Sequence, residues 1–157
     1  QRRDLAGDVY FLFSAYEETG MTGARVAGFG IRPDYALVLD VTHASVPEAK
    51  DRYLPEFGSG VAIAASPVTN RRLTRLVTEI CRNGNVPFTV DACPGSTGTN
   101  ANVLGMAADG IPTALCSLPL KSMHTSAEVL SVEDARALSR VVSLFIKSKE
   151  ISEVFGR

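Results

Sequence analysis

Short apolar runs alternate with amphipathic stretches along the whole chain. Each run is nearly free of charged residues, as expected for a strand that is buried on both faces of a parallel sheet. Pro87 and Pro112 precede two of the runs, at positions where a missing backbone N–H is tolerated. The pattern therefore predicts five strands, at residues 8–13, 35–40, 61–65, 88–90 and 113–117.

Three amphipathic stretches predict helices between and after these strands. Residues 70–83 place apolar side chains on one face at helical spacing, and Gly84 follows as a C-cap. Residues 102–109 predict a shorter helix, and Ser131 can cap a last helix whose apolar face reaches Phe145. Strands that alternate with helices indicate an α/β domain with a largely parallel sheet. In such sheets ligands gather beyond the carboxyl ends of the strands.

Composition narrows the class of protein. The 157 residues suffice for one domain, and the shares of 45% hydrophobic and 21% charged residues are typical of a globular protein. A net charge of -1 without a basic run argues against nucleic acid, and no apolar stretch is long enough to span a membrane. The three cysteines form no paired motif, so we expect reduced thiols and a cytoplasmic location. Because the chain starts with Gln1 and has no signal-type region, we expect further polypeptide upstream.

Groups that could carry chemistry follow three of the predicted strands. Glu17 and Glu18 come shortly after the first strand, Asp40 ends the second, and His124 follows the last. Adjacent carboxylates on an extended backbone point in opposite directions, so one could bind a metal while the other faces a substrate. Each signal also has a plain structural explanation: Glu17 and Glu18 could be a solvated acidic pair, Asp40 could cap a loop, and His124 could be a structural histidine. Together they favour zinc or a similar metal, and His43 is either a neighbour of the site or simply exposed.

Five stretches of the chain resemble one family. They are residues 13–24 (FSAYEETGMTGA), 39–44 (LDVTHA), 98–101 (GTNA), 110–114 (GIPTA) and 123–128 (MHTSAE). In this order they resemble the glutamyl and deblocking aminopeptidases, whose assembled forms are called tetrahedral aminopeptidases (metallopeptidase family forty-two). The resemblance implies a three-layer α/β/α sandwich with a mostly parallel sheet, of the zinc-peptidase type. It also implies that residues 1–157 are the C-terminal portion of a catalytic domain.

The resemblance implies roles for particular residues. Glu17 would be the general base, and Glu18, Asp40 and His124 would be ligands of two divalent ions, zinc or cobalt. The implied substrate is a peptide with a free N-terminus, and the full-length protein is implied to be a homo-oligomer. The tentative substrate-binding residues are His43, Gly98, Thr99 and Asn100.

The sequence departs from the family in ways that change the expectation. The family has two further upstream ligands, a histidine and a bridging aspartate, and an inserted dimerisation domain, and none of these has a counterpart here. Asn100 stands where relatives commonly have aspartate. Three protein ligands are too few for two ions, so we expect this chain alone to be nearly inactive. Two alternatives stay open: a related metal-dependent deacylase or dipeptidase, and a metal-free assembly module.

Overall fold

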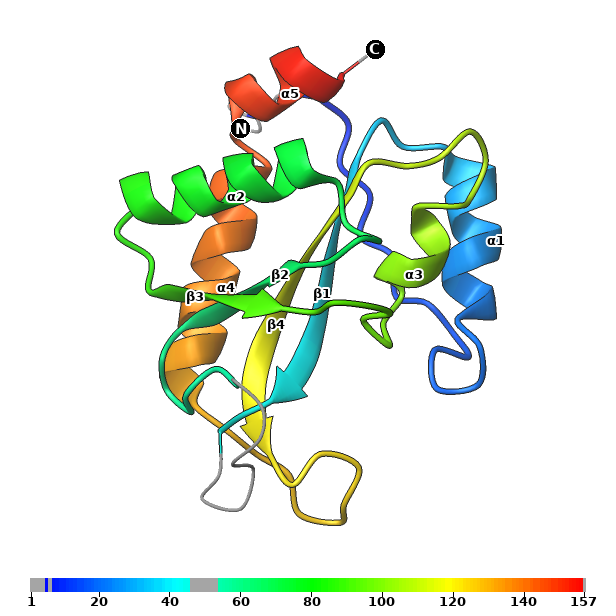
Figure 1. Ribbon diagram of the computed structural model, residues 1–157. Coiled ribbons are helices and arrows are strands. Elements are labelled where there is room, and N and C mark those ends of the chain that lie inside the picture. Colours follow the sequence, from blue (N-terminus) through cyan, green and yellow to red (C-terminus); the bar gives the residue numbers. More distant parts are fainter. Residues whose placement is uncertain (1–4, 6, 46–53, 157) are drawn as a thin grey trace.

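The computed structural model describes residues 5, 7–45 and 54–156 as an α/β fold (Figure 1). The strands are β1 (Ala36–His43), β2 (Val61–Ala65), β3 (Phe88–Ala92), β4 (Thr113–Lys121) and β5 (Val129–Leu130). The helices are α1 (Thr22–Ile31), α2 (Arg71–Asn83), α3 (Ala101–Leu104), α4 (Val132–Phe145) and α5 (Lys149–Phe155). None of the helices in the described ranges has the length and apolar character that a membrane crossing requires.

The strands form one mixed sheet in the order β1-β4-β2-β3, with β5 paired to β4. The two longer pairings are parallel: β1 runs beside β4 from Ala36↔Thr113 to His43↔Leu120, and β2 runs beside β3. The contacts of β4 with β2 and with β5 are shorter and antiparallel. Because β1 and β4 are parallel, their carboxyl ends meet at one end of the sheet.

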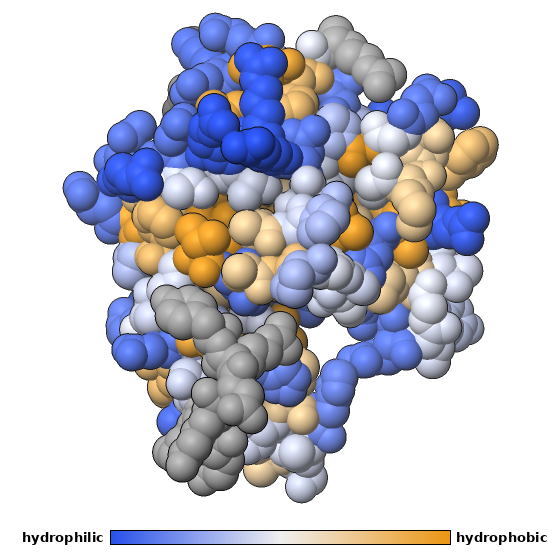
Figure 2. All heavy atoms as spheres, viewed as in Figure 1, coloured by the Kyte–Doolittle hydropathy of each residue, from blue (hydrophilic) through white to orange (hydrophobic). Residues whose placement is uncertain are grey.

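Helices cover both faces of the sheet. Alternate residues of β4 enter two different apolar clusters: Ala114 and Cys116 pack with α2, α4 and α5, whereas Leu115 packs with α3 and with Val38 of β1. Helix α1 lies beside α3, on the same side as the second cluster (Figure 1). In the view of Figure 2, apolar side chains around α1 lie among charged ones. The expected three-layer α/β/α arrangement is confirmed.

Two of the three predicted helices have the expected form because their ends are specified locally. The side chain of Asn70 accepts hydrogen bonds from the amides of Arg72 and Leu73, and Ser131 caps α4 in the same manner. The helix predicted at residues 102–109 was wrong in length, since α3 ends at Leu104. Beyond it the backbone continues in turns, and Ala108 adopts a left-handed conformation (φ 50°), which no α-helix can include.

The strand predicted at residues 8–13 was wrong. This segment is extended, but it pairs with no strand among the described residues, and it is exposed: 67% for Tyr10 and 95% for Phe13. The apolar run signals burial, but a strand also needs a neighbour that satisfies its backbone. Helices α1 and α5 were not predicted, because their short glycine-containing or charged sequences carry little amphipathic signal.

Candidate metal and catalytic site

Glu17 and Glu18 lie in a tight turn between the extended segment and α1. The amide of Met21 donates to the carbonyl oxygens of Tyr16 (2.8 Å) and Glu17 (3.1 Å). Tyr16 and Met21 both have a φ near 60°, so the chain reverses within a few residues. Helix α1 starts immediately afterwards, at Thr22. The turn therefore presents both carboxylates next to the N-terminus of a helix.

Two contacts fix the turn on the rest of the fold. The amide of Gly23 donates to the carbonyl oxygen of Ala15 at 3.0 Å. A Cβ atom on Gly23 would lie 2.4 Å from that same oxygen, so only glycine fits at this position. On the other side, Nδ2 of Asn100 donates to Oγ of Ser14 at 3.0 Å. Both contacts hold the residues just before the glutamates.

His124 reaches this turn from the far end of β4. Its Nε2 lies 3.2 Å from Oε1 of Glu18, and both side chains are exposed. The histidine sits in a loop in which Ser122 and His124 have left-handed backbone conformations. Glu128 accepts a hydrogen bond from the backbone amide of His124 at 2.6 Å, which holds the loop in this shape.

Asp40 occupies the neighbouring strand, β1, opposite Ser117 of β4. Its Oδ1 accepts a hydrogen bond from the amide of Val41 at 2.8 Å. Burial is the main cause that raises the pKa of Asp40, the Val41 amide lowers it, and the charge of Glu18 raises it further. Asp40 is thus a half-buried carboxylate within the electrostatic reach of Glu18.

Glu17 is subject to the charges of all three of these groups. Partial burial raises its pKa first, the carboxylates of Asp40 and Glu18 raise it further, and His124 lowers it. A carboxylate whose pKa is raised toward neutrality is a better general base, because it holds a proton more readily during the reaction. The structure brings Glu17, Glu18, Asp40 and His124 into one interacting group.

The fit of a metal to this group can be judged from its donor set. Two carboxylates and an imidazole suit zinc or cobalt, and Glu18 and His124 already touch. However, no set of three or more His, Cys, Asp or Glu side chains in the described part of the chain is arranged to enclose an ion. The residue types fit a metal in their chemistry, but in this arrangement the described side chains do not by themselves enclose one.

The tentative substrate residues lie at the end of β1 and just before α3. His43 is an odd number of positions beyond Asp40 on β1, so its exposed side chain leaves the opposite face of the strand. The hydroxyl of Thr99 is buried, accepts a hydrogen bond from the amide of Ala101 and contacts the hydroxyl of Thr97. It therefore helps to start α3. Substrate binding by His43, Gly98, Thr99 and Asn100 stays a prediction.

Sequence reasoning missed the residues that support the site. Ser14 and Glu128 carry no local signal of their role, because each acts on a residue that only the fold brings near. Asp91 of β3 was also missed. It is buried, its Oδ2 accepts a hydrogen bond from the hydroxyl of Thr42 at 3.2 Å, and its Oδ1 has no hydrogen-bond partner in the described structure. The signal for it was a carboxylate directly after an apolar run.

Comparison with known proteins places the chain in a family. The profile of the M42 glutamyl aminopeptidases matches residues 1–141. A lysyl aminopeptidase of Pyrococcus furiosus is 36% identical over 137 residues, which cover 87% of this chain and 39% of that protein. A crystal structure of a TET aminopeptidase from a marine sediment archaeon of the Thaumarchaeota matches with a TM-score of 0.82 at 26% identity, over 90% of this chain and 41% of that one.

A further structural relative is known as an assembly. The TET1 peptidase of Pyrococcus horikoshii, which can assemble into a tetrahedron or a large octahedral shell, matches with a TM-score of 0.70 at 25% identity. The match covers 85% of this chain and 39% of that one. The chain spans between 39% and 42% of the lengths of the curated relatives that it matches. These agreements confirm the resemblance seen in the sequence, and the chain belongs to the M42 glutamyl aminopeptidase family.

Proposed function

We propose that this chain supplies part of a dinuclear metal site with which an aminopeptidase removes N-terminal residues from peptides. Glu18, Asp40 and His124 are the proposed metal ligands, and Glu17 is the proposed general base. The observation that carries the proposal is the 3.2 Å contact between His124 and Glu18. Asp40 lies close enough to this pair that, after burial, its charge helps to raise the pKa of Glu17, and the charge of Glu18 helps to raise the pKa of Asp40. Family membership supports the class of reaction.

The chemistry assigned to Glu17 follows from its surroundings. A bound divalent cation would supply a Lewis acid and a water of lowered pKa. Glu17 accepts the proton of the attacking water as the general base. It then donates the proton to the departing amine. Glu18 and His124, whose side chains lie 3.2 Å apart, would hold the ion.

The proposal also covers the place of this chain in a longer protein and in its assembly. Residues 1–157 would be the C-terminal portion of a catalytic domain in a cytoplasmic homo-oligomeric enzyme. The assembly of the Pyrococcus horikoshii relative supports the oligomer. Three protein ligands do not saturate two ions, so the isolated chain is expected to bind zinc or cobalt weakly and to turn over little substrate. Fast hydrolysis by the isolated chain would contradict this part of the proposal.

Metal binding tests the ligand set directly. The chain is titrated with cobalt(II), and the visible absorption of the bound ion is followed. Glu18→Gln and His124→Gln should each weaken binding by about tenfold or more, as expected for loss of a ligand. Glu79→Gln, on α2 in the layer across the sheet, is the matched control and should bind as the original chain does. Equal binding by all four proteins, or no binding by the original chain, would refute the ligand assignment.

A chimera tests the reaction. In it, this chain replaces the matched portion of the Pyrococcus furiosus lysyl aminopeptidase. It should cleave aminoacyl p-nitroanilides with a free amino group and leave the N-acetylated analogues intact. Glu17→Gln in the chimera should lower kcat by about 10²- to 10⁴-fold while cobalt binding persists, because it removes only the base. Cleavage of the N-acetylated substrates would instead support a deacylase.

A further inference from the structure

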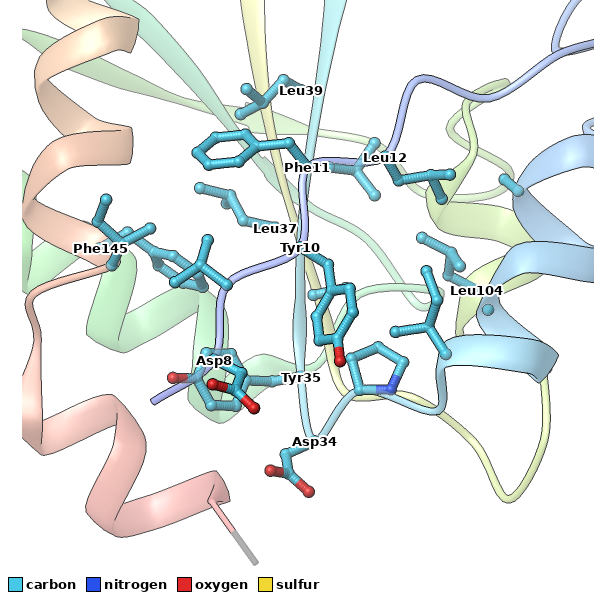
Figure 3. A pocket seen from close by; sticks show the side chains of 18 of the residues that line it. Asp8, Tyr10, Phe11, Leu12, Asp34, Tyr35, Leu37, Leu39, Leu104 and Phe145 are labelled. Carbon is cyan, nitrogen blue, oxygen red and sulfur yellow. The ribbon is translucent and has the colours of Figure 1, made fainter. Parts of the chain in front are cut away.

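The loop that carries His124 stands largely free of the rest of the fold. It comprises residues 122–128, between β4 and the short strand β5, and it projects past the end of β4 (Figure 1). Every residue from 124 to 128 is exposed. The cavity between segment 8–13 and β1 (Figure 3) is lined by none of these loop residues. An exposed loop gains little from apolar burial, so its hydrogen bonds decide its shape.

The backbone of the loop is in an uncommon conformation at His124. Ser122 and His124 both have a φ of 60°, in the left-handed region. Residues other than glycine rarely adopt this conformation, and it persists only where the surroundings hold it. A return to a negative φ would turn the Cα–Cβ bond of His124. The imidazole would then leave the place where its Nε2 lies 3.2 Å from Oε1 of Glu18.

Two side chains tie the loop together from within. The amide of Thr125 (3.2 Å) and its hydroxyl (2.7 Å) both donate to the carbonyl oxygen of Ser122, which closes the first turn. Glu128 makes the second tie, because its Oε1 accepts a hydrogen bond from the amide of His124 at 2.6 Å. Among the hydrogen bonds of the described residues, this is the one that engages the backbone of His124.

We propose that Glu128 is a positioning residue, which holds His124 in its left-handed conformation and so presents Nε2 for metal binding before an ion arrives. The inference rests on the proposed function, in which His124 is a metal ligand. Glu128 acts as a hydrogen-bond acceptor, and neither its charge nor direct contact with the ion is needed. A ligand that is already in place binds an ion more tightly than one that must first be ordered.

Removal of the acceptor tests this role. Glu128→Ala should weaken cobalt binding by about tenfold or more, as is typical when a residue that orients a ligand is replaced. Glu128→Gln keeps a side-chain oxygen that can accept the same hydrogen bond, so its cobalt affinity should stay within about threefold of the original. Glu153→Ala, which removes an exposed carboxylate from α5, is the matched control for the loss of charge and should bind as the original chain does.

Hydrogen exchange of the isotope-labelled, metal-free chain reports on His124 directly. Its amide should exchange about tenfold or more slowly in the original chain and in Glu128→Gln than in Glu128→Ala, because only the alanine variant lacks the acceptor. The measurement needs neither metal nor activity, so it is independent of the function of the site. Since Glu128 is exposed, all variants should fold, and their circular dichroism spectra should be the same.

Activity of the chimera gives a third readout. A positioning residue affects how tightly the ion is held and not the reaction itself. Glu128→Ala should therefore raise the cobalt concentration for half-maximal activity about tenfold, while kcat at saturating cobalt stays within about threefold of the original. A fall in kcat that excess cobalt does not restore would place Glu128 in the catalytic machinery and overturn the positioning role.

The variants also separate this inference from the proposed function. Equal cobalt affinities of Glu128→Ala and Glu128→Gln would show that the accepted hydrogen bond is not what matters, and would overturn the inference alone. Unchanged exchange of the His124 amide in Glu128→Ala would do the same, as would an equal loss of affinity in Glu153→Ala. Absence of cobalt binding by the original chain would instead refute the ligand set of the proposed function, and this inference with it.

Discussion

Replacing Gly23 by alanine should displace the turn that carries Glu17 and Glu18. The new Cβ would lie 2.4 Å from the carbonyl oxygen and 2.6 Å from the amide nitrogen of Ala15, whereas real contacts of this kind are at least 3.0 Å. The turn must therefore shift by several tenths of an ångström. Because both neighbours are backbone atoms, a rotamer change cannot relieve the overlap.

The expected magnitude combines three contributions. The shift weakens the 3.0 Å hydrogen bond from Gly23 to Ala15, which contributes about 1 kcal/mol. Steric strain in a packed site costs about 1–3 kcal/mol, and the better helix propensity of alanine offsets about 1 kcal/mol. The free energy of unfolding of Gly23→Ala should therefore fall by about 1–3 kcal/mol. Its cobalt affinity should also fall, because Glu18 moves away from His124.

The same helix supplies the control. Gly30 of α1 has no atom within 4 Å of the place where a Cβ would be, so Gly30→Ala should stabilise the chain by up to about 1 kcal/mol through helix propensity alone. Urea unfolding of both variants and a cobalt titration of the same samples measure the two effects. If Gly23→Ala proves as stable as Gly30→Ala, or keeps its full cobalt affinity, then Gly23 does not position the turn.

Three other predictions concern two hydrogen-bonded side chains and two buried thiols. Asp134 is 1% exposed and accepts hydrogen bonds from the amides of Gly58, at 3.0 Å, and Gly60, at 2.8 Å. Asp134→Ala should therefore lower the free energy of unfolding, measured in urea, by about 2–5 kcal/mol. A loss under about 1 kcal/mol would contradict this. Asn100→Ala removes the bond to Ser14 and should weaken cobalt binding by about threefold to tenfold with little change in stability; unchanged binding would show that the bond does not position the turn. Burial raises the pKa of Cys81 to about 11 and that of Cys116 still further. Neither thiol should therefore react with a disulfide reagent near pH 8 until the chain unfolds. Rapid labelling of the folded chain would disprove their burial.

The sequence by itself determined the elements whose signals are local. Helix α2 begins where Asn70 caps it, and α4 begins at the cap of Ser131, because the capping groups and the amides they satisfy are neighbours along the chain. Four of the five predicted strands are present, since an unbroken apolar run favours burial on both faces of a sheet. The short quoted motifs also sufficed to indicate the family, which the comparisons confirm.

Only the tertiary structure decided which distant residues meet. His124 contacts Glu18 because the loop after β4 reaches the turn before α1, and neither segment encodes that approach alone. The bond from Asn100 to Ser14 likewise depends on how two loops approach each other. Segment 8–13 also shows what its sequence could not determine, namely whether it forms a strand. Its composition specifies an apolar extended chain, but a strand exists only where a neighbour satisfies its backbone, and that neighbour is a property of the fold.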